Sequence, residues 1–223
     1  MKFIEKGESP DEFESWKEYS RPSRWNDLHG SLPQTREEGV IYYSTGQLRT
    51  VLHKEQNGLC CYCNSKINDD HTSPIEHLEP REGDTQTDRI FDYNNLLLSC
   101  NGGQKENTNP KVLHCDANKK SNPINLTPLI RECEIEIYFT EVGEIKAITD
   151  RAINTITILN LIALDNKRKE AILPFIYRDF DSDNPIDILP NEVIEQSYTL
   201  LQENHHIEYW SAIVSVLRGY LYL

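Results

Sequence analysis

Positive charge is scarce in this sequence of 223 residues. It has 23 Lys and Arg residues against 36 Asp and Glu residues, which gives a formal net charge of −13 and a pI near 5.0. Proteins that hold nucleic acid through their overall charge depend on Lys and Arg, because these residues displace counterions from phosphates. The composition excludes that mode of binding, so a partner or a local basic patch would have to supply the positive charge.

Long apolar runs are missing as well. No stretch approaches the roughly 20 residues needed to span a bilayer, and residues 1–5 do not resemble a signal peptide. We therefore expect a cytoplasmic protein. In that compartment a disulfide framework is not expected for the six cysteines.

Five of the six cysteines lie between Gly58 and Asn122. Cys60 and Cys63 enclose two residues, a spacing that lets two thiolates of one tight turn face a single tetrahedral ion. A second pair becomes available if the polar insert from Asn101 to His114 loops out. The sequence therefore predicts a structural Zn²⁺ site with the ligands Cys60, Cys63, Cys100 and Cys115.

Three other residues bear on this site. Cys61 is an alternative ligand to Cys60, and His114 could replace a thiolate because it adjoins Cys115. Cys133 is expected to be a core cysteine. The competing interpretation is that all of these cysteines are simply buried, which is common for this residue type.

A Glu-His pair, Glu76-His77, lies between the two cysteine pairs, in a segment bounded by Pro74 and Pro80 that is typical of a short strand. A Glu beside a His offers a hard-metal oxygen ligand and a general base at one place. Asn95 lies at the start of the apolar run before the third cysteine.

These motifs, in this order, resemble the HNH endonuclease family over roughly residues 49–125. Residues 58–63, 75–78, 95–100 and 114–119 are similar to the branch that contains PtuB, the HNH subunit of Septu anti-phage systems. In that branch the resemblance extends into the C-terminal helices. It implies a zinc-stapled ββα-metal core, an endonuclease activity with DNA as the expected substrate, and a PtuA-like ATPase subunit as partner.

The resemblance also implies roles for single residues. Glu76 matches the acidic ligand of a catalytic Mg²⁺ or Mn²⁺, His77 the general base, and Asn95 the central Asn. The residue after the fourth cysteine is usually His or Asn, whereas here it is Asp116, with Asn118 two positions further on. Either residue could be the second metal ligand. Two further alternatives are an RNA nuclease, for example one acting on tRNA, and a non-catalytic zinc-stapled module that binds nucleic acid or protein.

One locally basic patch accompanies the predicted site. Four lysines outnumber the acidic residues Glu106 and Asp116 there and would suit a phosphate backbone. A solvated lysine loop is an equally good interpretation. The four candidates for nucleic-acid contact are Lys105, Lys111, Lys119 and Lys120.

The sequence predicts an α+β fold in three parts. Residues 1–48 form an N-terminal helical arm, residues 49–125 the HNH core, and residues 126–223 a β-hairpin and helices. Helices are expected after Pro10 and over residues 43–56, with Trp16, Trp25, Tyr42 and Tyr43 in the core rather than stacked on bases. On the second helix, His53 could approach the metal site, but a structural or exposed position is expected.

In the third part, alternation from Ile135 through Ile137 to Phe139 predicts a strand, and apolar residues at helical spacing from Ala152 to Phe175 predict a helix. Residues 179–185 form an acidic linker that lacks the glycine and distal Glu of a calcium loop. The last forty or so residues are expected to be helical. Their end is apolar and must be buried. We expect it to form part of the interface with the ATPase partner, and the competing interpretation is that it closes the chain's own core.

Overall fold

The computed structural model describes residues 1–28, 32, 37–81, 89–104, 109–178 and 188–221. Within these residues the chain combines short helices with two antiparallel sheets of two strands each. The α-helices are α1 (Asp11–Ser20), α2 (Thr45–Glu55), α3 (Asp116–Lys119), α4 (Cys133–Glu136), α5 (Asp150–Ile158), α6 (Asp165–Ile172), α7 (Asn191–Glu203) and α8 (Trp210–Leu221). The strands are β1 (Ile75–His77), β2 (Leu96–Leu98), β3 (Ile137–Phe139) and β4 (Ile145–Ala147). This content is consistent with the expected α+β class, and the three domain boundaries stay a prediction.

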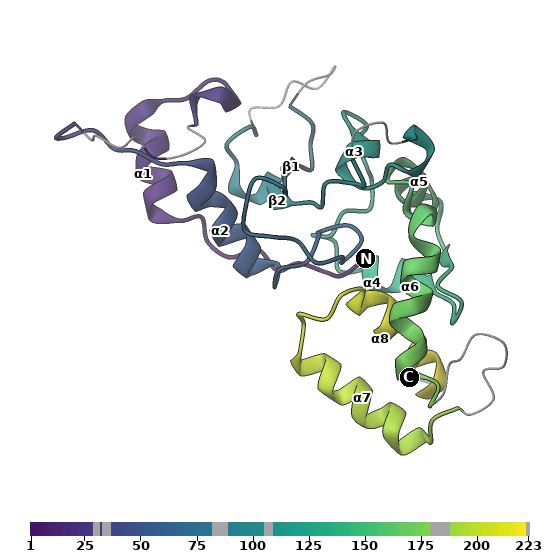
Figure 1. Cartoon of the computed structure of the whole chain (residues 1–223). Coiled ribbons are helices and arrows are strands. Elements are labelled where there is room, and N and C mark those ends of the chain that lie inside the picture. The colour runs from purple at the N-terminus through teal and green to yellow at the C-terminus, as the bar shows by residue number, and fades with distance from the viewer. Residues whose placement is uncertain (29–31, 33–36, 82–88, 105–108, 179–187, 222–223) are drawn as a thin grey trace.

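The first sheet lies between the N-terminal helices and the C-terminal helices. In Figure 1, α1 and α2 lie at one end of the chain, α7 and α8 at the other, and β1 and β2 between them. β1 pairs antiparallel with β2, with Glu76 opposite Leu97 and His77 opposite Leu96. The helical turn α3 follows these strands in the chain, an order that is consistent with the ββα core implied by the resemblance.

The N-terminal helices form where the sequence predicts them. α1 begins directly after Pro10, buries Phe13 and Trp16, and ends at Arg21, which adopts a left-handed φ of 46°. α2 begins after Ser44, whose hydroxyl accepts a hydrogen bond from a backbone N–H of its first turn. Both helices bury an apolar face, and α2 packs on β2.

A buried glutamine at the end of α2 fixes this helix to the sheet. The side chain of Gln56 accepts a hydrogen bond from the N–H of Leu98 at 2.6 Å and donates to the carbonyl of the same residue at 2.8 Å. It also donates to the carbonyl of Leu59 at 2.9 Å. A single amide thus satisfies backbone groups of the edge strand and of the loop that carries the first two cysteines.

The second sheet begins later than predicted. Residues 133–136 form the helical turn α4, and Ile135, which was expected on the buried face of a strand, is 62% exposed. The turn instead directs Glu136 toward Arg151 and toward the hydroxyl of Thr149, which both bind its carboxylate. A buried carboxylate needs such partners, and this requirement outweighs the alternating pattern.

The helix predicted from Ala152 to Phe175 is interrupted. α5 ends near Leu159, and Asn160 adopts a left-handed φ of 46° before a short 3₁₀ turn (Leu161–Leu164) leads into α6. The side chain of Asn160 donates to the carbonyls of Lys111 and Leu113, at 3.0 and 2.7 Å. The break therefore places Asn160 where it binds the segment before the fourth cysteine. A helical periodicity in the sequence cannot reveal such a contact.

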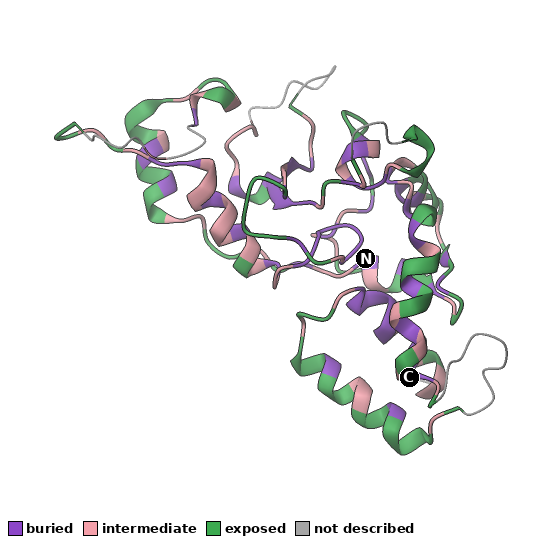
Figure 2. Ribbon diagram, viewed as in Figure 1, coloured by how far each residue is buried: buried purple, intermediate pink, exposed green. Residues whose placement is uncertain are grey.

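The last forty or so residues are helical, as expected, and consist of α7 and α8. The segment between α7 and α8 brings Trp210 to the last turn of α7, where its indole N–H donates to the carbonyl of Leu201 at 2.7 Å. Figure 2 shows α8 largely buried, and the side chains from Trp210 to Leu217 pack against α6, α7 and β3. Trp210 to Leu217 are therefore buried in the chain's own core, and docking of the ATPase partner on the helical C-terminus stays a prediction.

No helix among the described residues is long and apolar enough to cross a membrane. The predicted linker at residues 179–185 lies outside the described residues.

Candidate metal centre and active site

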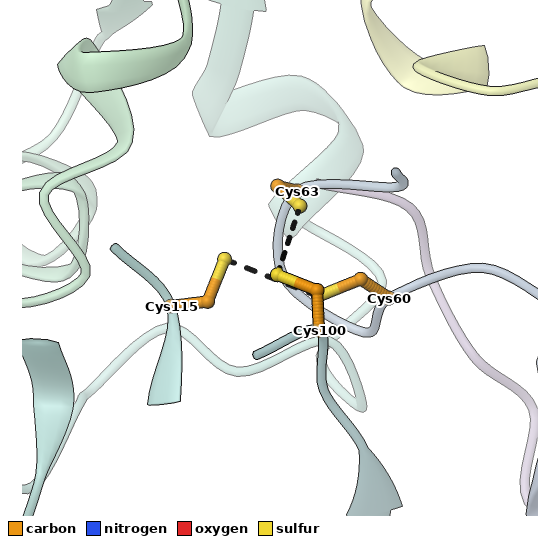
Figure 3. Close-up of side chains that lie close together, drawn as sticks. All are labelled: Cys60, Cys63, Cys100 and Cys115. Atoms are coloured by element: carbon orange, nitrogen blue, oxygen red, sulfur yellow. Dashed lines mark hydrogen bonds between the residues drawn. The ribbon is translucent and has the colours of Figure 1, made fainter. Parts of the chain in front are cut away.

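Four cysteine sulfur atoms converge beside the first sheet. The Sγ atoms of Cys60 and Cys115 are 3.9 Å apart, those of Cys63 and Cys100 are 3.8 Å apart, and all four lie within 4.8 Å of one another. Figure 3 shows the four side chains pointing toward one another. A tetrahedral zinc ion with Zn–S bonds of about 2.3 Å requires sulfur atoms about 3.8 Å apart, so the four thiolates fit Zn²⁺.

The local backbone explains the approach of the first pair. The N–H of Cys60 donates to the carbonyl of Ser65 at 2.9 Å, and the N–H of Asn64 donates to the carbonyl of Cys60 at 3.0 Å. Asn64 adopts a left-handed φ of 60°, which asparagine tolerates better than most residues. The N–H of Cys61 donates to the carbonyl of Leu98 at 3.0 Å, which attaches the tight turn to β2.

The alternative ligands lie outside the cluster. Among the described residues the cluster contains only the four predicted cysteines, so Cys61 as a replacement for Cys60 is wrong, and burial raises the pKa of the Cys61 thiol. His114 lies beside the cluster, with Nδ1 3.2 Å from Sγ of Cys115, as a hydrogen-bond partner of a sulfur that is already in place. Cys133 is a core cysteine, as predicted, and its Sγ lies 3.5 Å from the carbonyl oxygen of Met1. His53 contacts the carbonyl of Ile67 through Nε2 at 3.1 Å, which confirms a structural position.

A pocket of about 310 Å³ opens next to this centre and is lined in part by β1. It joins residues from the strand, from the segment after it and from the start and end of α3. Its lining consists of Pro74, Ile75, Glu76, His77, Pro80, Arg81, Asp116, Lys120 and Ser121. Three of the predicted catalytic residues, Glu76, His77 and Asp116, therefore meet in one pocket.

Glu76 is almost fully buried in this pocket. Its Oε1 accepts a hydrogen bond from the hydroxyl of Tyr62 at 2.8 Å and lies 2.7 Å from Nζ of Lys119. Burial and the neighbouring Asp116 carboxylate raise the pKa of Glu76 to about 8, against the opposing effect of Lys119. The neighbouring Asp116 carboxylate thus disfavours ionisation of the buried Glu76, and a divalent cation between the two would remove that penalty. Their oxygen atoms suit Mg²⁺ or Mn²⁺.

His77 is oriented by a backbone carbonyl. Its Nε2 lies 3.0 Å from the carbonyl oxygen of Ile90, and because that oxygen can only accept, Nε2 must carry the proton. In the neutral ring, Nδ1 is then left with a free lone pair. Burial lowers the pKa of His77 to about 4, so the ring is neutral at cellular pH. Trp25 packs edge-on against it, with ring centroids 4.6 Å apart, in a half-buried position consistent with the predicted core role.

Asn95 holds the backbone around His77. Its Oδ1 accepts from the N–H of Glu79 at 2.7 Å, and its Nδ2 donates to the carbonyls of Glu79 and Arg89, each at 3.1 Å. It therefore connects the end of β1 to the segment that supplies the Ile90 carbonyl. This is a positioning role for the residue that the resemblance identifies as the central Asn.

The helical turn α3 separates the two candidate second ligands. Asp116 lines the pocket beside Glu76, whereas the side chain of Asn118 donates to the carbonyl of Ile158 at 2.9 Å and does not line the pocket. α3 is bracketed by Cys115 and Lys120, whose φ values of 53° and 52° are unusual for residues with a side chain. The structure thus brings Asp116, and not Asn118, to Glu76.

The predicted basic patch is only partly on the surface. Lys119 is wrong as a nucleic-acid contact, because it is fully buried as the partner of Glu76. Lys111 is exposed but does not line the pocket, Lys120 is exposed and does, and Lys105 lies outside the described residues. Arg81, which the sequence analysis missed, supplies a second cation at the pocket, and its position directly after the strand segment was the available signal.

Comparison with known proteins gives a partial match. No family model matches the chain. The chain is 32% identical over 87 residues to a protein of Vibrio cholerae serotype O1 biovar El Tor named "Retron Vc95 putative HNH endonuclease". The match spans 39% of this chain and 40% of that protein, so the chain covers less than half the length of this relative. The similarity supports an HNH-type nuclease.

Proposed function

We propose that this chain is a metal-dependent HNH endonuclease that hydrolyses phosphodiester bonds, with DNA as its substrate. The observation that carries the proposal is that His77 lines the same pocket as the carboxylates of Glu76 and Asp116. Its Nε2 donates to the Ile90 carbonyl, so Nδ1 carries no proton and can accept one. A general base, two hard oxygen ligands and two cations at one pocket suit phosphoryl transfer.

The two carboxylates would hold the catalytic Mg²⁺ or Mn²⁺. When bound, such an ion supplies positive charge against the negative charge that develops on the phosphate and on the leaving 3′ oxygen. The zinc centre is separate, since its four thiolates fill a tetrahedral shell and leave no open position for substrate.

The proton transfer follows from the tautomer of His77. A water molecule attacks phosphorus, its oxygen forms the new P–O bond, and its proton passes to Nδ1 of His77. The bond from phosphorus to the 3′ oxygen breaks, and that oxygen leaves with its electron pair. Asn95 keeps the imidazole in place through the segment that carries Ile90.

We further propose that the chain is the nuclease effector of a two-component anti-phage system of the Septu type, like PtuB, with a PtuA-like ATPase as partner. The motif order from Cys60 to Lys119 supports this, and so does the net charge of −13, which favours a complex in which another chain holds the nucleic acid. Co-expression with a PtuA-like ATPase encoded in the same genome, followed by pull-down through a tag on either protein, tests the pair directly.

The activity is tested by incubating the chain, alone and with its genomic neighbour, with plasmid DNA and with total RNA in Mg²⁺. His77→Ala should abolish cleavage and leave zinc content and folding intact, because a general base contributes to the barrier rather than to the core. His71→Ala is the matched control, since His71 is exposed and lies outside the pocket. Cleavage of RNA alone would favour the RNA nuclease, and no cleavage in any mixture would favour the zinc-stapled binding module.

A further inference from the structure

Tyr62 lies inside the zinc-binding turn but contacts the active-site pocket. It stands between Cys61 and Cys63, its side chain is almost fully buried, and its hydroxyl donates to Oε1 of Glu76 at 2.8 Å. No sequence feature assigns a chemical role to this tyrosine. Its position makes it a direct connection between the two predicted metal sites.

The two carboxylate oxygens of Glu76 differ in their hydrogen-bond partners. Oε1 receives both the hydroxyl of Tyr62 and the ammonium group of Lys119. These two partners occupy the lone pairs of that oxygen, which leaves Oε2 available as a metal ligand. The carboxylate is therefore held in one orientation by two buried donors.

Both donors are anchored by zinc ligands. Tyr62 immediately precedes Cys63, and Lys119 lies one helical turn after Cys115, with its backbone N–H donating to the carbonyl of Cys115 at 2.9 Å. Lys119 also donates to the carbonyl of His77 at 3.1 Å. The position of Glu76 is thus set by the two segments that the zinc ion would hold together.

We propose that Tyr62 is a positioning residue for the divalent-cation site, which orients Glu76 and makes the geometry of that site depend on the zinc-binding turn. This rests on the proposed function, because it assigns Glu76 as a ligand of the catalytic ion. Partners that orient metal ligands contribute strongly to affinity, and their loss typically costs about 10–100-fold in metal binding or activity.

The test measures Mn²⁺ binding by calorimetry to the zinc-loaded full chain, without substrate. Tyr62→Phe should raise the Kd for Mn²⁺ about tenfold, with zinc content and melting temperature close to those of the wild type. Tyr93→Phe is the matched control, because the Tyr93 hydroxyl also donates to a glutamate, Glu55, at 3.2 Å but outside the pocket. It should leave the Kd unchanged.

A double-mutant cycle connects the effect to Glu76. In a Glu76→Gln background, Tyr62→Phe should not change the Kd further, because the oriented carboxylate is already gone. Replacement of Tyr62 by 4-aminophenylalanine, which keeps the ring and a hydrogen-bond donor, should restore wild-type affinity. Cleavage by Tyr62→Phe should recover as Mg²⁺ is raised, since the defect lies in metal binding.

The outcomes separate this inference from the proposed function. Mn²⁺ binding that depends on Glu76 but not on Tyr62 would overturn the inference alone. Mn²⁺ binding that is indifferent to Glu76→Gln would overturn the proposed metal site and the inference with it. Loss of zinc or of the folded state in Tyr62→Phe would identify a structural tyrosine and would also overturn the inference.

Discussion

The ammonium group of Lys119 lies 2.7 Å from Oε1 of Glu76, and both side chains are almost completely removed from solvent. A lysine in a sequence this acidic would be expected at the surface, where it could meet a phosphate. Here it is an internal counter-ion of a predicted metal ligand. Its loss should therefore act on folding and on the metal site rather than on substrate contact.

Lys119→Met should lower the free energy of unfolding by about 2 kcal/mol, because Oε1 of Glu76 and the buried carbonyl of His77 both lose a hydrogen-bond donor. Lys120→Met, at the next position, should change it by less than about 0.5 kcal/mol, since that side chain is exposed. Urea denaturation followed by circular dichroism measures both. Equal stability of the two variants would show that Lys119 is not an internal counter-ion.

Removal of zinc should unfold the part of the chain that the four cysteine ligands hold together. We expect one tightly bound zinc ion per chain by elemental analysis, and loss of both zinc and cooperative unfolding in Cys63→Ser. Cys133→Ala should keep the zinc, because its sulfur lies outside the cluster. A metal-free sample that is fully folded would contradict the structural zinc site.

Asp116→Ala should require a higher Mg²⁺ concentration for half-maximal cleavage, because it removes one of two oxygen ligands at the pocket. Asn118→Ala should leave that concentration unchanged and cost about 1 kcal/mol of stability through its lost hydrogen bond to the carbonyl of Ile158. Cleavage rates across a Mg²⁺ titration distinguish the two. The reverse pattern would assign the second ligand to Asn118.

Asn95→Ala should destabilise the chain by about 3 kcal/mol, one for each of three buried hydrogen bonds. Cleavage should fall in the folded fraction as well, because the backbone that orients His77 is no longer held. Asn94→Ala serves as control, since Asn94 is exposed. Thermal unfolding and single-turnover cleavage are the two measurements, and wild-type cleavage in Asn95→Ala would remove the positioning role.

Arg81→Ala and Lys120→Ala should weaken substrate binding at the pocket. Each loss of a phosphate contact should reduce the slope of log affinity against log salt by about 1, without sequence preference. Lys66→Ala, an exposed lysine that does not line the pocket, is the control. Binding of a labelled oligonucleotide at several salt concentrations to a His77→Ala chain measures the effect without cleavage. Unchanged slopes in both variants would place the substrate elsewhere.

The cysteine cluster and the Glu-His strand could be predicted from the sequence because each depends on residue type and spacing alone. Two thiolates three positions apart in a turn face one ion whatever surrounds them. Proline at both ends of the Glu76-His77 segment likewise fixes an extended backbone locally. The pair Cys60 and Cys63 and the Glu-His strand need no knowledge of long-range packing, whereas Cys100 and Cys115 reach the cluster from far along the chain.

The contacts of Tyr62, Lys119 and Asn160 could not be predicted, because each is made with a residue far away in the sequence. Tyr62 reads as a buried aromatic, Lys119 as one lysine in a basic segment, and Asn160 as an ordinary residue in a helical pattern. Tyr62 and Lys119 bind Glu76, and Asn160 binds a backbone carbonyl shortly before Cys115. Only the fold brings these groups close to one another. The late start of the second sheet also depends on contacts between distant residues, because the carboxylate of Glu136 binds Arg151 and Thr149.

The two ends of α3 have a consequence for engineering. Cys115 and Lys120 hold backbone angles that glycine adopts freely and that cost other residues about 1–3 kcal/mol each. Cys115 supplies a thiolate to the predicted zinc site, and Lys120 supplies a cation to the lining of the pocket. Selection for thermostability alone would favour glycine at Lys120, and the same substitution would remove a substrate contact. If Lys120 contacts the substrate as proposed, resistance to heat and the proposed nuclease activity should evolve in opposite directions at the turn around α3.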